Sequence, residues 1–521
     1  MNTSGNAAPS RAIAPTAAGC VGASGTAFRA FARKPWVRLL LLALVLGFAF
    51  QGTRALWSTD EGRYVDGALQ MLASGDYLVP AYSPDRINLS KPPLTYWTIA
   101  GAIALFGHDT WAVRAPYAVA FVLTVMLLYA MGTRLVPERP WLPGLLYACS
   151  VLPFLSANVV NTDVLLTLCE ALAALGFVRL EFGNRHGSQR WNAVLMWLGL
   201  GLAFLTKGPP GLILLLAAVP FVVLRGGWQG LRRLFQPLGL LVFGVVGLVW
   251  YLAVVVHDPR ALHYFLYREV YERIFTAALR RNPGPWGWAA VYVPAFAIGL
   301  LPWWPLALRG LPHCLRTRSW LRRLRGDPPR LFLLLWFVVP LAVFCLARSR
   351  LPLYVLPLFL PLALLLAQAR WPAVDLHKPL QLGLLVAWLV LLVALKGSVS
   401  SFAHPVSDHR VAARQLASVT RGQRYDALVF VENVDTDYKV EERTPWGLRL
   451  YLRRPVYGLA WYAADRDKRL CHALRLNRSA LLLLAAPVAQ QALHVIRSAC
   501  PVHTLVRVGT WRHRWLERVE G

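Results

Sequence analysis

Charged residues are scarce in this chain, at 16% of its 521 residues, whereas 56% of the residues are hydrophobic. A soluble enzyme of this length needs a more charged surface, so the composition excludes an ordinary soluble fold. The apolar residues gather in repeated runs of about 15 to 20, which is close to the length of a helix that crosses a bilayer. The composition therefore predicts a polytopic membrane protein.

Acidic residues are the scarcer charge type, with 26 Asp and Glu against 55 Lys and Arg. In a soluble protein the resulting net charge of +29 would suggest nucleic acid as a partner. Here the basic residues outnumber the acidic ones in alternate loops, namely 1–38, 134–140, 179–190, 225–236, 309–330 and 370–378. Because loops rich in Lys and Arg stay in the cytoplasm, we expect a cytoplasmic N-terminus and no nucleic-acid partner.

Several motifs of soluble enzymes are missing. The seven cysteines form no CxxC pair and show no His/Cys ligand spacing, so nothing indicates a structural zinc site. No Gly-rich dinucleotide fingerprint is present, and Lys207-Gly208-Pro209 lacks the spacing of a phosphate-binding loop. The sequence therefore calls for no cofactor, no metal and no nucleotide-sugar donor, and only the need for a divalent cation stays open.

The apolar runs define the organisation of the membrane part. They lie near 37–54, 113–133, 141–157, 163–180, 191–206, 210–224, 237–256, 289–308, 331–347, 351–369 and 379–396. They predict about 11 spans, and up to about 13 where short spans split or pair. A further short run, 93–107, would move the arginine-rich loop 309–330 to the outside if it crossed. We therefore interpret 93–107 as an interfacial or re-entrant helix.

The pattern predicts a mainly α-helical membrane protein with a small external α/β domain. Its regions are a disordered cytoplasmic N-terminus (1–36), a membrane domain (37–397) with a first external loop (55–112), and an external domain (398–521). The last region lacks a spanning run and alternates short apolar stretches with helical ones. Cys471 and Cys500 share it, and an oxidising compartment could join them or leave them as free thiols.

Ionisable residues follow the first span, at Asp60-Glu61 and at Lys91-Pro92-Pro93. Charged groups beside hydrocarbon are costly, so they are usually placed there for function. The alternative for the acidic pair is the capping of a helix N-terminus. The alternative for Lys91 is a lysine that extends to the bilayer surface.

Several motifs in order resemble the signature of the lipid A aminoarabinose transferase family. They are Asp60-Glu-Gly-Arg-Tyr64, Met71-Leu-Ala-Ser-Gly-Asp-Tyr77, Lys91-Pro-Pro-Leu-Thr-Tyr-Trp97, Asn161-Thr-Asp163, Leu205-Thr-Lys-Gly-Pro209 and Arg348-Ser-Arg-Leu-Pro-Leu-Tyr-Val-Leu-Pro357. The resemblance covers residues 37–370 well and the C-terminal region weakly. It implies the GT-C fold and a glycosyltransferase that uses a polyprenyl-phosphate-linked sugar.

The resemblance also implies roles for individual residues. Asp60 and Asp163 are expected to be catalytic, and Lys91 and Arg273 to bind the donor phosphate, whose charge grows as it leaves. Substrate contacts are expected from Glu61, Arg63, Tyr64, Ser90, Glu269 and Tyr354. Simpler roles stay open: Asp163 as a helix cap, Arg273 as an i,i+4 partner of Glu269, and the two tyrosines as interfacial aromatic residues.

One position departs from the family pattern, because Ser90 stands where many members carry Glu before Lys-Pro-Pro. The identity of the sugar and of the acceptor is therefore open. The resemblance implies 4-amino-4-deoxy-L-arabinose or a similar sugar on undecaprenyl phosphate, with membrane lipids around it. It implies lipid A or another envelope glycan as acceptor, on the periplasmic side of a bacterial inner membrane.

Two other functions are alternatives to this one. A related protein O-mannosyltransferase or cell-surface glycan transferase would share the donor chemistry. A transporter or flippase should show inverted repeats and charges near the middle of spans. No internal repeat of fixed period is found, and the charged residues gather at the external ends of spans, which favours an enzyme.

Overall fold

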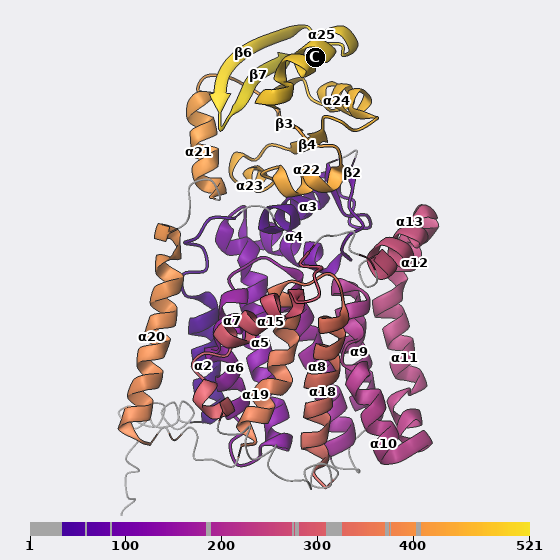
Figure 1. Cartoon of the computed structure of the whole chain (residues 1–521), viewed down its shortest axis with the longest axis vertical. Helices are drawn as coiled ribbons and strands as arrows, with labels where there is room; N and C mark the ends of the chain where they lie inside the picture. The colour runs from indigo at the N-terminus through magenta and orange to yellow at the C-terminus, as the bar shows by residue number, and fades with distance from the viewer. Residues whose placement is uncertain are drawn as a thin grey trace, which may run out of the picture.

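The computed structural model describes residues 34–57, 60–83, 86–183, 189–272, 276, 281–308, 326–369, 375, 377–402 and 408–520. Within these ranges the chain forms a tall helical bundle with a smaller α/β domain at one end (Figure 1). The first external loop lies between the two parts.

The bundle consists of helices that follow the apolar runs of the sequence. They are α2 (Pro35–Phe48), α5 (Thr110–Leu135), α6 (Leu142–Cys149), α7 (Val151–Ser156), α8 (Thr162–Phe182), α9 (Gln189–Lys207), η1 (Pro209–Leu212), α10 (Leu215–Leu234), α11 (Pro237–Phe243), η2 (Gly244–Leu248), α12 (Val249–His257), α13 (Arg260–His263), η3 (Tyr264–Glu272), α15 (Gly287–Gly299), α18 (Pro328–Leu346), η4 (Pro352–Leu358), α19 (Phe359–Ala367) and α20 (Pro379–Phe402). Apart from α13 and η3, which lie between the runs 237–256 and 289–308, Leu, Val and Ala dominate these helices, as in helices that face lipid and neighbouring helices.

Five helical segments of the described chain are long and apolar enough to cross a membrane. They are Thr110–Leu135, Pro209–Leu234, Pro237–His257, Pro328–Leu346 and Pro379–Val399. The expected mainly helical membrane fold is thus confirmed, whereas the total of about 11 to 13 spans stays a prediction.

Small residues bring the two central helices of the bundle together. A Cβ on Gly176 of α8 would lie 2.4 Å from the backbone nitrogen of Met196 in α9. A Cβ on Gly199 of α9 would lie 2.4 Å from the backbone nitrogen of Ala173. Glycine at both positions lets the backbones touch, which is how helices associate where no water drives them together.

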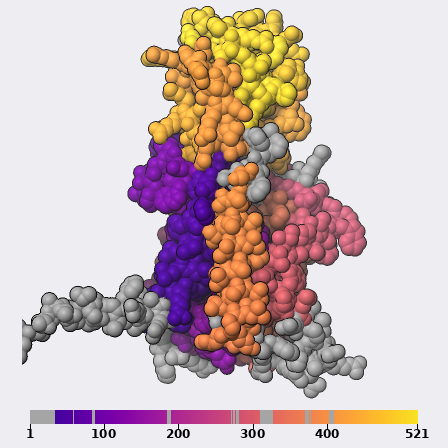
Figure 2. All heavy atoms as spheres, turned by 90° about the vertical axis from the view of Figure 1, so that its left-hand side faces the viewer, coloured from indigo at the N-terminus to yellow at the C-terminus, as the bar shows by residue number. Residues whose placement is uncertain are grey.

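Helix α20 runs along the outside of the bundle beside α2, as Figure 2 shows. Its Lys396 is buried, and its ammonium group donates hydrogen bonds to the carbonyl oxygens of Leu46 (3.1 Å) and Gly47 (2.8 Å). These carbonyls belong to the last turn of α2, where they lack partners within their own helix. The lysine therefore joins α20 to α2.

The C-terminal domain contains a five-stranded sheet in the order β4-β3-β5-β7-β6. The strands are β3 (Ala427–Glu432), β4 (Val456–Ala460), β5 (Ser479–Ala485), β6 (Thr504–Trp511) and β7 (Arg514–Glu520). The first three run parallel, and β7 pairs antiparallel with β5 and β6. The expected small α/β domain is present.

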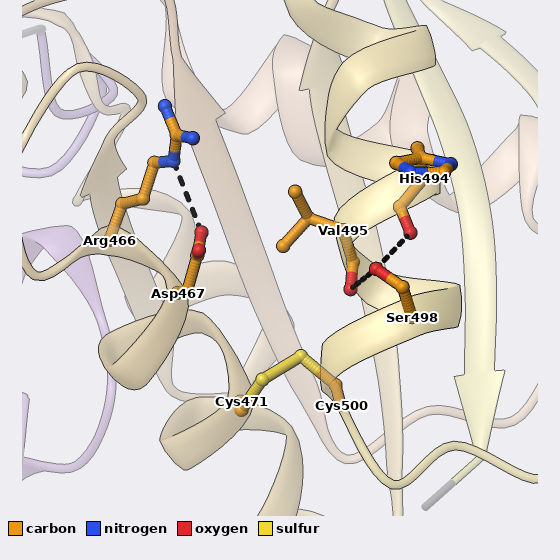
Figure 3. The surroundings of a disulfide bond; sticks show 7 residues. All are labelled: Arg466, Asp467, Cys471, His494, Val495, Ser498 and Cys500. Atoms are coloured by element: carbon orange, nitrogen blue, oxygen red, sulfur yellow. Dashed lines mark hydrogen bonds and ion pairs between the residues drawn. A yellow bond between two sulfur atoms is a disulfide. The ribbon is translucent and has the colours of Figure 1, made fainter.

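Helices cover both faces of this sheet. They are α21 (His409–Val419), α22 (Asp437–Arg443), α23 (Leu448–Leu452), α24 (Arg466–Arg475), η5 (Ala486–Val488) and α25 (Ala489–Ala499). Strand β3 is buried along its whole length, as the parallel arrangement requires. On one face the disulfide Cys471–Cys500 links α24 to the end of α25 (Figure 3), so the pairing left open by the sequence is present.

The segment 55–112, which is expected to be the first external loop, forms α3 (Asp60–Ser74), β1 (Ala81–Ser83), β2 (Arg86–Ile87) and α4 (Leu94–Phe106). Figure 1 places α3 and α4 at the end of the bundle, below the C-terminal domain. Helix α4 has 13 residues, and at about 1.5 Å per residue it is too short to cross a bilayer. An interfacial or re-entrant position agrees with this length and stays a prediction.

The C-terminal domain docks directly on α3. A Cβ on Gly62 would lie 2.6 Å from the backbone nitrogen of Gly447, so only glycine permits this approach. Asp66 is completely buried, and its Oδ1 lies 3.4 Å from a guanidinium nitrogen of Arg449. Burial raises the pKa of Asp66 to about 7, although Arg449 opposes the rise. The contact thus buries a carboxyl group and an arginine between α3 and the C-terminal domain.

Candidate functional site

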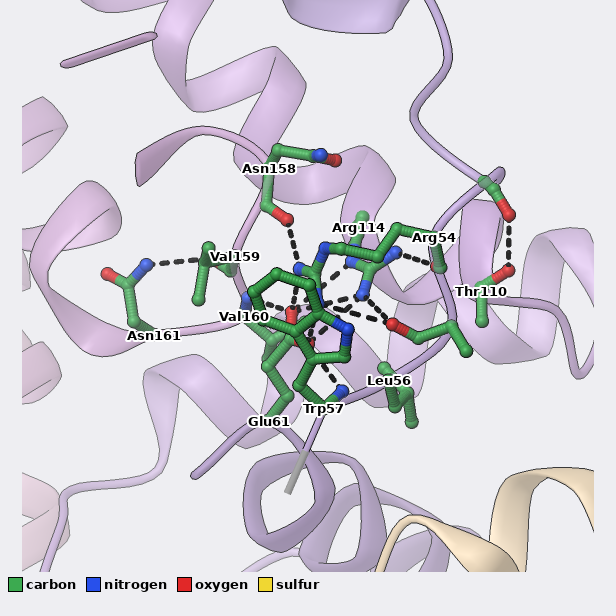
Figure 4. A network of polar contacts seen from close by, with 12 residues as sticks. Arg54, Leu56, Trp57, Glu61, Thr110, Arg114, Asn158, Val159, Val160 and Asn161 are labelled. Atoms are coloured by element: carbon green, nitrogen blue, oxygen red, sulfur yellow. Dashed lines mark hydrogen bonds and ion pairs between the residues drawn. The ribbon is translucent and has the colours of Figure 1, made fainter. Parts of the chain in front are cut away.

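Glu61 lies in a buried cluster with two arginines (Figure 4). Its carboxylate oxygens accept hydrogen bonds from Arg54 at 2.8 and 2.9 Å and from Arg114 at 3.1 to 3.3 Å. The backbone N–H groups of Trp57 (2.9 Å) and Val160 (3.0 Å) donate to the same carboxylate. Burial opposes the charge of Glu61, but Arg114 and Arg54 outweigh it and lower the pKa of Glu61 to about 2. This charge holds the start of α3 against α5 and the segment before α8.

Asp60 is the first residue of α3 and points the other way. Successive helical residues are about 100° apart around the axis, so a buried Glu61 leaves Asp60 on the open side. The side chain of Asp60 is 64% exposed and pairs with Arg63 one turn later. Tyr64 follows on the same side, and its ring lies 5.9 Å from that of Tyr96.

Asp163 stands at the start of α8 without serving as its cap. The side chain of Asn161 caps this helix by accepting hydrogen bonds from the N–H groups of Asp163 (2.8 Å) and Val164 (3.0 Å). The carboxylate of Asp163 instead pairs with the ammonium group of Lys207 at the end of α9. Lys207 also lies 4.2 Å from the centre of the Tyr354 ring, a cation–π distance. The three side chains form one polar group at the end of the bundle.

Lys91 lies at the base of α4 with little exposure. Its ammonium group donates a hydrogen bond to the carbonyl oxygen of Ser90 (2.7 Å) and lies 4.0 Å from the carboxylate of Glu269 on η3. The hydroxyl of Ser90 donates to the side-chain oxygen of Asn88 (2.6 Å), which fixes the loop before the lysine. The ammonium group is thus held at the cavity wall between Ser90 and Glu269.

These groups surround one cavity of about 630 Å³ between the bundle and the C-terminal domain. Its walls include several of the site residues that the sequence predicts, namely Asp60, Arg63, Tyr64, Ser90, Lys91, Asp163, Glu269 and Tyr354. The structure therefore brings together side chains that are spread over nearly 300 positions of the chain, counted from Asp60 to Tyr354.

Two members of that set stand apart. Glu61 does not line the cavity, and its carboxylate is occupied by the arginine cluster, so the expected substrate contact has to be replaced by a structural role. The physical reason is its neighbours: Arg54 and Arg114 turn that side of α3 inward. Arg273 lies outside the described residues.

Sequence reasoning missed the other walls of the cavity. The spacing of Lys207-Gly208-Pro209 indicates no phosphate-binding loop, but Lys207 lies in a matched motif at the end of an apolar run, which is a signal for a site residue. Asp437, Tyr438 and Glu441 of α22 and Arg469 of α24 line the cavity from the C-terminal domain. No motif marks them. Among the described residues, no group of three or more His, Cys, Asp or Glu side chains is placed to hold a metal ion.

Comparisons with known proteins give relatives for most of the chain. Residues 90–257 match the family described as dolichyl-phosphate-mannose-protein mannosyltransferase. The undecaprenyl phosphate-alpha-4-amino-4-deoxy-L-arabinose arabinosyl transferase of Edwardsiella ictaluri is 33% identical over 64% of this chain. The match spans 58% of that relative's length. A second transferase of this name, from Pseudomonas fluorescens, is 32% identical over 73% of this chain and 68% of its own length.

Solved structures extend the likeness to nearly the whole fold. The crystal structure of ArnT from Cupriavidus metallidurans bound to undecaprenyl phosphate has a TM-score of 0.70 at 21% identity, covering 92% of this chain and 97% of that one. The oligosaccharyltransferase of Archaeoglobus fulgidus has a TM-score of 0.52 at 13% identity, covering 81% and 64%. The fold is therefore that of the GT-C glycosyltransferases, and the chain is a multi-pass membrane protein.

Proposed function

Because this chain belongs to the family of undecaprenyl phosphate-4-amino-4-deoxy-L-arabinose arabinosyl transferases, we propose that it is an integral membrane glycosyltransferase. Its donor is a sugar on a polyprenyl phosphate, and its acceptor is lipid A or a similar envelope glycan. The observation that carries the proposal is the cavity into which two carboxylates, Asp60 and Asp163, and two lysines, Lys91 and Lys207, all open.

The donor end of the cavity is the side of Lys91. In the transfer, the bond between the anomeric carbon and the phosphate oxygen breaks, and its electron pair leaves with the phosphate. Cations near that oxygen stabilise the charge as it develops. Lys91 supplies one such cation, and we assign the same role to Arg273, which lies outside the described residues.

The carboxylates serve the acceptor and the sugar. An acceptor oxygen forms the new bond to the anomeric carbon as the old bond breaks. When the acceptor is a phosphate it is already anionic, and Asp60 then orients it and stabilises positive charge on the sugar ring. When the acceptor is a hydroxyl, its proton passes to the Asp60 carboxylate, which acts as general base. Asp163, held by Lys207, supports the same charge from the other side.

A substrate contact from Ser90, Tyr64, Glu269 and Tyr354 completes the proposed site. Ser90 is neutral where the family pattern has Glu, so this position offers no charge to an amino sugar. Glu269 of η3 lines the same cavity and supplies a carboxylate beside Lys91. A sugar with an amino group, such as 4-amino-4-deoxy-L-arabinose, therefore still meets carboxylates in this site.

The direct test is mass spectrometry of lipid A from cells with and without the gene. We expect the gene to add one sugar to a lipid A phosphate, and the purified protein to do the same from undecaprenyl phosphate-4-amino-4-deoxy-L-arabinose. A sugar found instead on protein hydroxyls would favour the O-mannosyltransferase-like alternative, which the match of residues 90–257 supports.

We further propose that the cavity faces the periplasm of a bacterial inner membrane. The arginine-rich loop 309–330 is then cytoplasmic, and the region 398–521 is external. Cysteine probes placed in each region and labelled from outside intact spheroplasts test this orientation. Labelling of 309–330 but not of 398–521 would overturn it.

A further inference from the structure

Helix α22 of the C-terminal domain lies directly above the end of the bundle (Figure 1). Its residues Asp437, Tyr438 and Glu441 line the cavity. Residues three and four apart share one face of a helix, so these side chains form a single face toward the site. Val440, on the other side, is buried in the core of the C-terminal domain and fixes the helix to its sheet.

The first contact of this face leads to Asp60. The carboxylate of Glu441 lies 3.6 Å from a guanidinium nitrogen of Arg63, and the same guanidinium pairs with Asp60. The side chains of Arg63 and Glu441 are only 12% and 21% exposed, so water screens their pairing little. Asp60, at 64%, is open to the cavity and has no comparable packing to fix it. Its position thus depends on where Arg63 is held.

The second contact of this face leads to Asp163. Arg281 lines the cavity together with Tyr438 and Tyr354; burial lowers the pKa of its guanidinium, but these two nearby tyrosines outweigh that effect and raise it. The ring of Tyr354 lies against Lys207, which pairs with Asp163. One turn of α22 therefore faces two series of contacts, of which one ends on Asp60 and the other on Asp163.

The neighbouring residues hold this turn in place. The ring of Trp446, which follows α22, stacks on Tyr82 of the external loop with centroids 5.1 Å apart. The close approach of Gly447 to Gly62 and the contact of Arg449 with Asp66 follow within three residues. These contacts are made with α3 and the loop that follows it. They therefore fix the position of α22 relative to Asp60, the first residue of α3.

We propose that α22 positions both carboxylates for transfer, with Glu441 acting on Asp60 through Arg63 and Tyr438 acting on Asp163 through Arg281, Tyr354 and Lys207. This inference rests on the proposed function of the two carboxylates. Glu441 and Tyr438 are positioning residues, since each acts through a side chain of the membrane domain. A small displacement of a reacting group is costly, so losing either contact slows the chemical step without weakening the binding of the donor.

The kinetic test compares Glu441→Gln and Tyr438→Phe with Asp435→Asn in the full-length protein in nanodiscs. Asp435 is a matched control because it lies just before α22, pairs with Lys439 at the surface and does not line the cavity. With undecaprenyl phosphate-4-amino-4-deoxy-L-arabinose and lipid A, we expect kcat to fall about ten- to a hundredfold in the first two variants. KM for the donor and the affinity for undecaprenyl phosphate should stay unchanged, and Asp435→Asn should match the wild type.

A double-mutant cycle tests the route. If Glu441 acts through Arg63, Glu441→Gln should add no further loss in an Arg63→Gln background. Independent, multiplying effects would overturn the route, as would a change in donor KM alone, which would mean that Glu441 contacts the substrate itself. Wild-type kcat in both Glu441→Gln and Tyr438→Phe would overturn the positioning role.

A measurement without turnover separates this inference from the proposed function. The NMR signal of the Asp60 carboxyl carbon, assigned with Asp60→Asn in protein labelled with carbon-13 at aspartate, should shift in Glu441→Gln and stay unchanged in Asp435→Asn. An unchanged signal in Glu441→Gln would count against positioning even if the enzyme is active. A wild-type protein that transfers no sugar to any acceptor would instead count against the proposed function, and the NMR result would still decide whether Glu441 holds Asp60.

Discussion

The arginine cluster around Glu61 and the ion pairs that line the cavity use the same chemical groups for opposite purposes. In the cluster, two guanidinium groups and two backbone N–H groups satisfy one carboxylate completely, and all of these residues except the half-buried Trp57 are buried. In the cavity, Asp60 has one arginine and is 64% exposed. A fully satisfied buried charge holds structure, whereas a charge with open hydrogen-bonding positions beside a cavity can act on a ligand.

The largest effect on transfer is expected from a substitution at Asp60. Asp60→Asn keeps the size of the side chain and removes its charge, so transfer should fall by roughly 10²- to 10⁴-fold. The thermal midpoint should stay close to that of the wild type, because an exposed side chain carries little of the fold. Transfer assays and thermal unfolding of the purified variant measure the two effects. Asparagine caps helices about as well as aspartate, so full activity would mean that Asp60 is only a cap.

Glu61→Gln should give the reverse pattern. It leaves two buried arginines without their counter-charge, which typically costs about 3–5 kcal/mol of stability. We expect a low yield of folded protein and a lower thermal midpoint, with near-normal turnover by the molecules that do fold. A stable but inactive Glu61→Gln protein would contradict the structural role and restore a substrate contact.

A smaller loss is expected at the donor side. Lys91→Ala removes one charge-assisted contact to the leaving phosphate, worth about 1.5–3 kcal/mol, or roughly a ten- to hundredfold fall in transfer. Lys439→Ala is the matched control, since Lys439 pairs with Asp435 at the surface and does not line the cavity. Equal activity of the two variants would remove Lys91 from the phosphate site.

The smallest effect concerns the pH dependence of stability. Burial raises the folded-state pKa of Asp66 from 3.8 to about 7, so its contribution to stability is present at low pH and is lost as the pH rises through about 7. Glu61, with a pKa lowered to about 2, stays charged throughout this window. Asp66→Asn should therefore flatten the fall in stability between about pH 4, near the unfolded-state pKa, and about pH 7. Thermal unfolding across that range measures it, and an unchanged slope would count against Asp66 as its source.

Much of the site followed from the sequence because its motifs lie at the ends of apolar runs. The runs near 163–180 and 351–369 place Asp163 and Tyr354 at span ends, and the structure brings both to the cavity. The difference between Asp60 and Glu61 could not be predicted this way. It depends on Arg114, which lies 53 residues beyond Glu61 and meets it only when α5 packs against α3.

The contribution of the C-terminal domain to the site could not be predicted from the sequence either. Helix α22 is a short polar segment whose composition suits any solvated surface. Its role follows from docking, which brings Glu441 beside Arg63 over a separation of nearly 380 residues. A pattern of periodicity and motifs describes neighbours along the chain and cannot report such a contact.

The bond of Lys396 to the end of α2 has a consequence for how the protein is made. Placed alone near the centre of a bilayer, a lysine costs about 2.5–3.5 kcal/mol to insert. The carbonyl oxygens of Leu46 and Gly47 offer it partners, and they belong to a helix that is synthesised some 350 residues earlier. Insertion of α20 is therefore easiest beside an α2 already in place. Helix α20 then packs against α2 before the ribosome has completed the C-terminal domain, which lines one side of the cavity.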